Sequence, residues 1–161
     1  MEIEKRYEVI KDKIPTNDIT SKIYIEQMYS NINPNVRIRK TIENGKTEYF
    51  HTVKYKTENK NSRVEIEQNI NEEDYNKIFK LIDKKPVRKN RYIIPIENGL
   101  TAEVDEFLDI NKTIVEVEFS DEKEMNNFVP PSWFGSELKG KQSFSVQLFS
   151  EINSIISIKF Y

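Results

Sequence analysis

The chain of 161 residues has the length of one ordinary domain, and its 25 Lys and Arg residues nearly balance 27 Asp and Glu residues. The net charge of −2 argues against general binding to duplex nucleic acid, which requires a positive surface to collect phosphates. The absence of cysteine excludes disulfides, thiolate zinc sites and a cysteine nucleophile. His51 is the only imidazole, so any bound metal must rest on carboxylates.

Membrane and targeting signals are missing from the sequence as well. It has no run of roughly 18 apolar residues and no basic N-terminus followed by an apolar stretch. We therefore expect a single domain over residues 1–161 that resides in the cytoplasm, without membrane or nucleic-acid partners. The sequence leaves the oligomeric state open, with a homodimer as one option.

Eight segments have the length and residue alternation typical of β-strands, and most are bounded by Asn, Gly, Pro or Lys-Asn turns. They lie near residues 2–9, 22–30, 35–42, 47–56, 62–70, 88–95, 101–107 and 113–120. Eight short strands predict a mainly β protein of the α+β class, built as a barrel or a sandwich.

A few helices are expected to flank these strands. Asn71 is a favourable capping residue, and acidic residues fill the turn that follows it. Apolar residues then recur at helical spacing, at Tyr75, Ile78, Phe79 and Ile82. Residues 121–128 are a weaker and shorter candidate. Residues 143–158 have an amphipathic helical pattern, although their β-branched side chains lower the helix propensity.

Five of the strand segments carry charges on every second residue. They are Glu2–Arg6, Val36–Arg39, Arg63–Glu67, Lys89–Tyr92 and Val115–Phe119. Because successive side chains of a strand point to opposite faces, each segment has one apolar face and one ionic face. A single such pair is typical of a solvated face with cross-strand ion pairs. All five together predict a site that holds a polyanion with its metal ions.

If the sheet closes into an eight-stranded barrel, one face of every strand points into an interior just wide enough for side chains or one small ligand. Charges buried there need partners or ligands. The candidate inward acids are Glu2, Glu4, Glu65, Glu67, Glu103, Asp105, Glu116 and Glu118. The candidate inward bases are Arg6, Arg37, Arg39, Lys54, Arg63, Lys89 and Arg91. Carboxylates suit Mg²⁺ bridged to phosphates, and Arg matches the geometry of phosphate oxygens.

In the same order and phase, these segments resemble the motifs of one family. Glu2–Arg6 is similar to E-x-E-x-K, Ile25–Tyr29 to I-E-Q-G-Y, Val36–Lys40 to V-R-I-R-K, Thr52–Lys54 to T-V-K, Arg63–Glu67 to R-x-E-x-E, Lys89–Tyr92 to K-T-R-Y, Val104–Phe107 to a D-x-F strand and Val115–Phe119 to A-E-V-E-F. The family is the CYTH domain, or triphosphate tunnel metalloenzymes, which includes class IV adenylate cyclases, thiamine triphosphatases and inorganic tripolyphosphatases. The resemblance covers roughly residues 2–120, and more loosely extends to about residue 148.

This resemblance implies a closed barrel of eight antiparallel strands that forms a tunnel for a triphosphate. It implies metal ligation of Mg²⁺ or Mn²⁺ by Glu2, Glu4, Glu116 and Glu118, with Glu65, Glu67, Glu103 and Asp105 as supporting acids. It implies phosphate binding by Arg6, Arg37, Arg39, Lys54, Arg63 and Arg91. Lys89 and Tyr29 are expected to position or activate the attacking water, although a half-buried strand tyrosine is as often a packing residue.

Two departures from the family pattern stand out. Arg6 replaces the last Lys of E-x-E-x-K, which keeps the charge but changes its reach and geometry, while Lys5 falls on the opposite strand face. Residues 133–141 resemble the family's W-L-G-x-E-V-T-G loop, but residues 142–146 lack the R-Y-x-N pattern that usually follows. The cover of the tunnel is therefore expected to differ here.

The expected activity is metal-dependent hydrolysis of the terminal phosphoanhydride of a small triphosphate, with inorganic tripolyphosphate favoured as the substrate. Phosphoryl transfer needs charge neutralisation and alignment more than a protein nucleophile. The alternatives are a thiamine triphosphatase, a class IV-type adenylate cyclase that attacks the α-phosphorus of ATP, and a module that binds polyphosphate or nucleotide without catalysis. No aromatic or amide cluster in the tunnel strands obviously suits an adenine, which disfavours the cyclase.

Overall fold

The computed structural model describes residues 2–59, 62–140 and 143–158, with the side chains beyond residue 154 left aside. Nine strands run in chain order: β1 (Glu2–Val9), β2 (Ser21–Asn31), β3 (Asn35–Glu43), β4 (Lys46–Lys56), β5 (Ser62–Asn69), β6 (Val87–Pro95), β7 (Thr101–Phe107), β8 (Lys112–Phe119) and β9 (Phe134–Glu137). The helices are α1 (Glu72–Ile82), α2 (Glu122–Asn126) and α3 (Phe144–Ile158), beside short 3₁₀ turns at Lys11–Lys13, Thr16–Asp18 and Glu97–Gly99.

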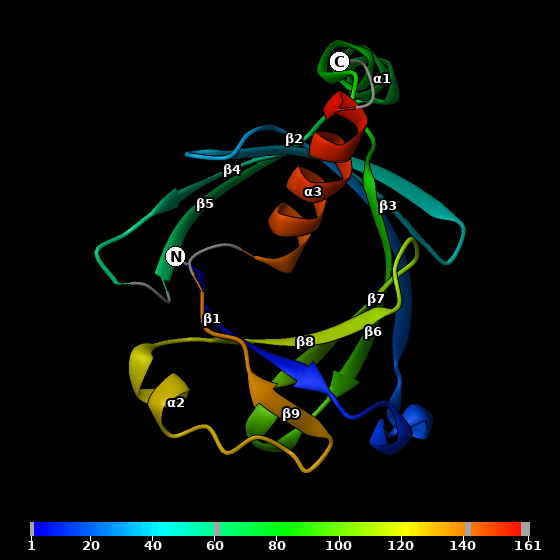
Figure 1. Ribbon diagram of the computed structural model, residues 1–161. Coiled ribbons are helices and arrows are strands. Elements are labelled where there is room, and N and C mark those ends of the chain that lie inside the picture. The colour runs from blue at the N-terminus through cyan, green and yellow to red at the C-terminus, as the bar shows by residue number, and fades with distance from the viewer. Residues whose placement is uncertain (1, 60–61, 141–142, 159–161) are drawn as a thin grey trace.

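The first eight strands form the closed antiparallel barrel that the resemblance implies (Figure 1). Their order around the barrel is β5-β4-β3-β2-β6-β7-β8-β1, and β1 returns to β5. Within the described residues, that closing contact is short and places Glu2 opposite Arg63 and Ile3 opposite Ser62. All eight expected strands are confirmed to within one or two residues.

The alternation of side chains explains why the barrel is charged within. In β3, Val36 and Ile38 face outward while Arg37 and Arg39 face the interior, and Ile38 is buried beneath α1 together with Tyr75. A second apolar cluster covers the opposite outer wall, where Ile3 and Val117 pack against Trp133. Apolar burial outside the barrel therefore offsets the cost of a polar interior.

Helix α1 begins where the sequence predicts. The Asn71 side chain accepts a hydrogen bond from the backbone N–H of Asp74 at 2.7 Å, and Asp83 ends the helix in a left-handed conformation. Helix α2 is shorter than expected but is capped in the same way, by Asp121 on the N–H of Glu124.

Helix α3 lies across part of the barrel opening (Figure 1). It packs on side chains that point into the barrel, like the charged ones, but that are aromatic or aliphatic near this opening. The Phe144 ring meets Phe107 at 4.8 Å, and the Phe149 ring meets Tyr29 at 5.3 Å. Ile114 belongs to the same cluster. The barrel interior is thus charged in its middle and apolar where α3 is seated.

Strand β9 is not predicted from the sequence. Its four residues pair with β1, where a side chain on Gly135 would lie 3.2 Å from the Cβ of Glu8, so glycine permits the close approach. Four residues with a central glycine carry too little alternation to be recognised as a strand.

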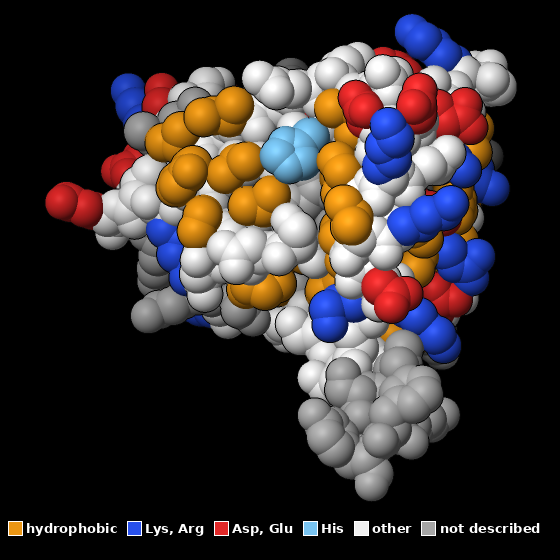
Figure 2. Space-filling view, turned by 90° about the horizontal axis from the view of Figure 1, so that it is seen from above, with side chains coloured by type: hydrophobic (Ala, Val, Ile, Leu, Met, Phe, Trp, Pro, Cys, Tyr) orange, Lys and Arg blue, Asp and Glu red, His pale blue; other side chains and the backbone are white. Residues whose placement is uncertain are grey.

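The outer face of β4 and β5 is partly apolar. Tyr55, Val64 and Ile66 are exposed there, and hydrophobic side chains gather beside His51 (Figure 2). The His51 side chain therefore lies on the outer face of the barrel. In the described residues, no helix combines the length and apolar character needed to span a membrane.

Candidate active site

A cavity of about 270 Å³ occupies the middle of the barrel, and we call it the inner cavity. Every barrel strand contributes at least one polar or charged side chain to it. Its lining is Glu2, Glu4, Gln27, Tyr29, Arg37, Arg39, Lys54, Glu65, Glu67, Lys89, Arg91, Glu103, Glu116, Glu118, Ser143 and Ser145. The lining thus includes all the site residues expected from the sequence except Arg6, Arg63 and Asp105.

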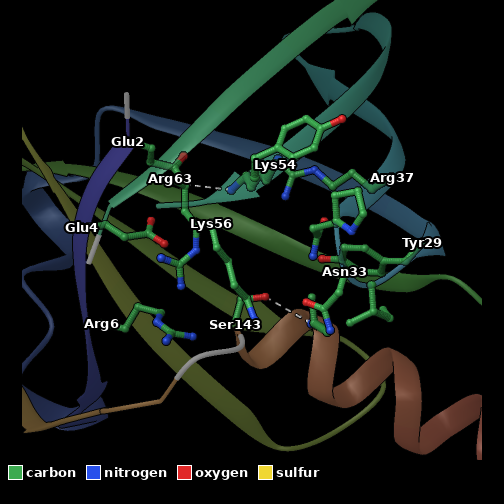
Figure 3. Close-up of a pocket in the computed structure, with 15 residues that line it drawn as sticks. Glu2, Glu4, Arg6, Tyr29, Asn33, Arg37, Lys54, Lys56, Arg63 and Ser143 are labelled. Carbon is green, nitrogen blue, oxygen red and sulfur yellow. Dashed lines mark hydrogen bonds and ion pairs between the residues drawn. The ribbon is translucent and has the colours of Figure 1, made fainter. Parts of the chain in front are cut away.

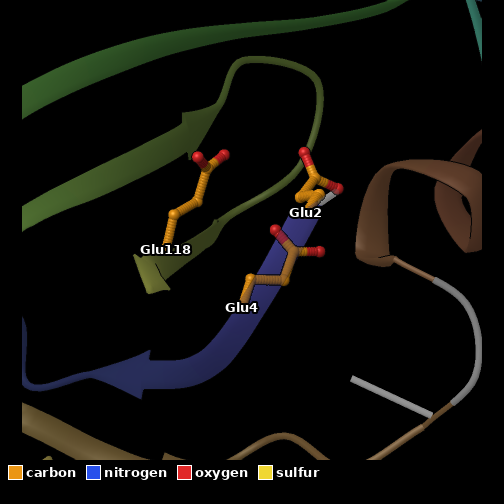
Figure 4. A group of neighbouring side chains, drawn as sticks. All are labelled: Glu2, Glu4 and Glu118. Carbon is orange, nitrogen blue, oxygen red and sulfur yellow. The ribbon is translucent and has the colours of Figure 1, made fainter. Parts of the chain in front are cut away.

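Three carboxylates meet on one wall of the inner cavity. Glu2, Glu4 and Glu118 each offer an oxygen, and these atoms all lie within 4.8 Å of one another (Figure 4). The strand register forces this meeting, because Glu4 lies directly opposite Glu118 in the β1–β8 pair. Like charges opposed across strands are destabilising unless a cation sits between them. The cluster therefore fits a hard divalent ion with oxygen ligands.

The pKa values of these acids reflect the crowding. Burial, followed by the charges of Glu116 and Glu2, raises the pKa of Glu4 well above its usual range. Burial and neighbouring acids, first Glu103, raise the pKa of Glu118 to about 7. Burial acts to raise the pKa of Glu2 as well, but the Lys54 ammonium 3.0 Å away, a hydrogen bond with Glu65 and the charge of Arg37 together lower it.

The fourth expected metal ligand stands slightly apart. Glu116 lines the cavity but lies opposite Arg6 in one pairing and opposite Glu103 in the other. It does not belong to the three-carboxylate group found among the described residues. Glu65 lies beside the group instead, where burial and a hydrogen bond with Glu2 raise its pKa.

Arginines form the facing wall. Arg39 is partly buried and donates from Nε to Gln27 at 3.0 Å, and desolvation, followed by the nearby Arg37 and Arg91, lowers its pKa to about 9. Arg37 is 7% exposed and reaches Glu65 only at 3.8 Å. Within the described part of the chain, its Nε has no hydrogen-bond partner. Crowded guanidinium groups with an unused donor are suited to an anion with several oxygens.

Asp105 does not line the inner cavity but holds two bases in place from behind. It accepts two hydrogen bonds from Arg91, at 2.7 and 2.9 Å, and its Oδ2 lies 2.8 Å from Nζ of Lys89. Burial opposes its ionisation, but Arg91 and Lys89 outweigh burial and lower its pKa. Arg91 also binds Glu103 at 2.9 Å.

Lys89 is 3% exposed, and this burial lowers its pKa to about 8 although Asp105 acts in the opposite direction. The positive charges of Arg91 and Arg39 add to the lowering. An amine with this pKa is partly neutral near physiological pH, so it can accept a proton. Tyr29, the other expected catalytic residue, accepts a hydrogen bond from Gln27 at 2.9 Å and is buried.

Arg6 and Arg63 line a second cavity of about 250 Å³ beside the β2–β3 loop (Figure 3). We call it the loop-side cavity, and it shares Glu2, Glu4 and Arg37 with the inner one. Arg6 donates to the backbone oxygen of Gly140 at 3.0 Å. The two arginines are thus placed at the edge of the site rather than deep within it.

Gln27, Ser143 and Ser145 were not recognised as site residues. The strand alternation could have found Gln27, which shares a face with Tyr29 and bridges it to Arg39. Ser143 and Ser145 belong to the segment that departs from the family pattern, of which residues 141 and 142 lie outside the described residues. Small hydroxyl residues at the start of a helix are ordinary capping candidates, so no signal marked them.

Acids on one wall and arginines on the other, inside a closed barrel, form a charged tunnel suited to a polyanion together with a cation. An inorganic triphosphatase from Acetivibrio thermocellus is 34% identical over 142 residues, which cover 86% of this chain and 86% of that protein. An inorganic triphosphatase from Nitrosomonas europaea is 35% identical over 94 residues, 57% of this chain and 61% of that relative, which is less than two thirds of its length.

A solved structure agrees with these relatives. The crystal structure of an inorganic triphosphatase matches with a TM-score of 0.61 and 26% identity, over 89% of this chain and 90% of that one. No family model matches the sequence. The identity and coverage of the relatives nevertheless show that the chain belongs to the CYTH family of triphosphate tunnel metalloenzymes.

Proposed function

We propose that this protein hydrolyses the terminal phosphoanhydride of inorganic tripolyphosphate, with Mg²⁺ or Mn²⁺, inside the inner cavity. The observation that carries the proposal is the separation of charge across that cavity. Three carboxylates converge within 4.8 Å on one wall, and Arg37, Arg39 and Arg91 line the rest of the cavity. A triphosphate and a divalent cation supply the two missing partners. The names of the relatives support the same activity.

Glu2, Glu4 and Glu118 would hold the metal, since they offer only oxygen ligands and lie close enough together to share one ion. Glu116 is proposed as a further ligand on the same side. When bound, the metal supplies positive charge that neutralises phosphate oxygens during transfer. The chain's own acids otherwise repel one another, as the raised pKa of Glu4 indicates.

Arg37, Arg39 and Arg91 would bind the phosphate oxygens, with Lys54 beside them. Arg37 has an unused donor, and Asp105 fixes the orientation of Arg91 from behind. Arg6 and Arg63 would act at the edge of the site, guiding a polyanion inward from the loop-side cavity. The extra bulk of Arg6 relative to lysine is accommodated there by its contact with Gly140.

Lys89 would accept the proton of the attacking water in its neutral form. The water oxygen bonds to the terminal phosphorus while the bond to the bridging oxygen breaks, which yields orthophosphate and pyrophosphate. Tyr29 would orient that water, since Gln27 fixes its hydroxyl in the cavity. Glu65, Glu67 and Glu103 would balance the charge of the bases that they face.

The cytoplasmic location and the oligomeric state stay predictions.

The direct test is to incubate the protein with Mg²⁺ or Mn²⁺ and, separately, tripolyphosphate, thiamine triphosphate and ATP. Products are resolved as orthophosphate, pyrophosphate and cyclic nucleotide. We expect orthophosphate from tripolyphosphate and its loss in EDTA. Pyrophosphate with cyclic AMP from ATP would support the cyclase instead, and binding without turnover of any compound would leave a binding module. Full activity in EDTA would overturn the metal mechanism.

A further inference from the structure

We propose that Ser145 of α3 is a positioning residue for Lys89, so that the seating of α3 controls the proton acceptor. This inference rests on the proposed hydrolysis, but the hydrogen bond between Lys89 and Ser145 is present in the structure whatever the activity. Lys89 Nζ donates to Ser145 Oγ at 3.2 Å, and the two residues are 56 apart in the sequence. Ser145 is 6% exposed and lines the inner cavity.

The surroundings of Lys89 give this hydroxyl its importance. A lysine ammonium has three N–H donors. One goes to Asp105 at 2.8 Å and one to Ser145, while Nζ also lies over the Phe107 ring, 5.6 Å from its centroid. Two fixed partners on different elements restrict the direction of the third donor. Because Lys89 lines the inner cavity, that donor is where a water or a phosphate oxygen would be met.

Helix α3 is held in the position that this contact requires. Phe144, next to Ser145, packs on the same Phe107 ring that Lys89 contacts, at 4.8 Å between centroids. Phe149 packs on Tyr29, the other proposed catalytic residue. The helix therefore contacts both side chains that would handle the attacking water. Displacing α3 removes the Ser145 contact and loosens both at once.

The hydrogen bond also affects how readily Lys89 gives up its proton. Ser145 Oγ accepts from the charged ammonium, which favours the charged form. The other charged groups that shift the pKa of Lys89 are Asp105, Arg91, Arg39 and Glu116, and substitution of Ser145 alters none of these side chains chemically. Removing the hydroxyl should therefore lower the pKa of Lys89, by roughly one unit for a hydrogen bond to a charged group.

The experiment compares Ser145→Ala with Ser145→Thr, which keeps a hydroxyl, and with Ser150→Ala, an exposed position on the same helix. Each variant is assayed for kcat and KM with Mg²⁺ and tripolyphosphate from pH 6 to 9. We expect Ser145→Ala to lose roughly tenfold in the kcat reached at high pH, with little change in KM, and its pH profile to move to lower pH. Ser145→Thr should recover part of both effects, and Ser150→Ala should match the wild type.

A second measurement does not depend on activity. The titration of Lys89 is followed by NMR of labelled lysine side chains, with Lys89→Arg used to assign the signal. Ser145→Ala should shift that titration to lower pH while thermal unfolding stays close to wild type. An unchanged titration and an unchanged kcat in Ser145→Ala would overturn the inference, and so would equal losses in the alanine and threonine variants. If the wild type does not hydrolyse tripolyphosphate, the proposed function fails while the NMR arm still decides the contact.

Discussion

The site is built from side chains that would repel one another in the absence of their ligands. Glu4 shows this most clearly, because burial and the charges of Glu116 and Glu2 raise its pKa. A carboxyl whose pKa is higher in the folded state binds more protons there, so the free energy of unfolding falls as pH rises from its unfolded pKa through its folded one. At neutral pH the ionised Glu4 thus lowers the free energy of unfolding, and a bound cation would raise it again.

We expect Glu4→Gln to melt at the same or a higher temperature than wild type in EDTA, because the variant removes a repelled charge. Added Mg²⁺ should stabilise the wild type more than the variant. Turnover should fall at least about tenfold, as for the loss of one metal ligand. Thermal unfolding in EDTA and with Mg²⁺ measures the two stability effects, and an orthophosphate assay measures turnover. Glu8→Gln, on the exposed end of β1, is the control. Equal metal stabilisation of variant and wild type would remove Glu4 from the ligand set.

For Lys89, the pH dependence has a definite sign. The neutral amine is the proposed proton acceptor and the pKa is lowered to about 8, so kcat should rise with pH and level off above that value. Lys89→Ala should depress kcat with little change in KM, whereas Arg39→Ala should also raise KM, because Arg39 is proposed to bind phosphate. Lys22→Ala, an exposed residue of β2, serves as the control. Equal effects on KM alone would make Lys89 another phosphate-binding residue.

At the scale of elements, helix α3 depends on a few contacts at its far end. Asn153 is buried, accepts from the Lys85 backbone N–H at 2.8 Å and donates to the oxygens of Lys85 and Phe149. Asn153→Ala should lower the free energy of unfolding by about 2–3 kcal/mol, since three hydrogen bonds are lost. Urea unfolding measures this, with the exposed Ser154→Ala as the control. A loss below about 0.5 kcal/mol would show that packing alone seats the helix.

The eight strands were predictable from their length, residue alternation and bounding turns. Five of them also carry charges in period two, which a strand places on one face. The same alternation also predicted which acidic and basic side chains face the interior of the barrel. Asp105 shows the limit of that argument, because its phase places it inside the barrel while only the register reveals that it faces Arg91 and Lys89 rather than the ligand. The contribution of α3 could not be foreseen, because the contact of Ser145 with Lys89 depends on how a distant helix is seated.

At the scale of the whole molecule, ligand binding should be visible as stability. A ligand present at 100 times its Kd stabilises the folded state by about 2.7 kcal/mol. For a domain of this size, that corresponds to a rise in Tm of roughly 5–10 °C. We expect tripolyphosphate with Mg²⁺ to produce such a rise in wild type and a smaller one in Arg39→Ala. Orthophosphate at the same concentration is the control, and no rise in wild type would contradict the tunnel site.

The contact between β1 and β5, which closes the barrel and which we call the seam, links the carboxylate cluster to the stability of the barrel. Among the described residues, two pairs join β1 to β5, and Glu2 belongs to one of them as well as to the carboxylate cluster. The same residue also reaches Lys54 of β4 across that seam. An ion bound between β1 and β8 would therefore restrain β1 next to its short contact with β5. Amide hydrogen exchange at Ile3 and Arg63 should then slow when metal is added, while exchange in the middle of β6 and β7 stays the same.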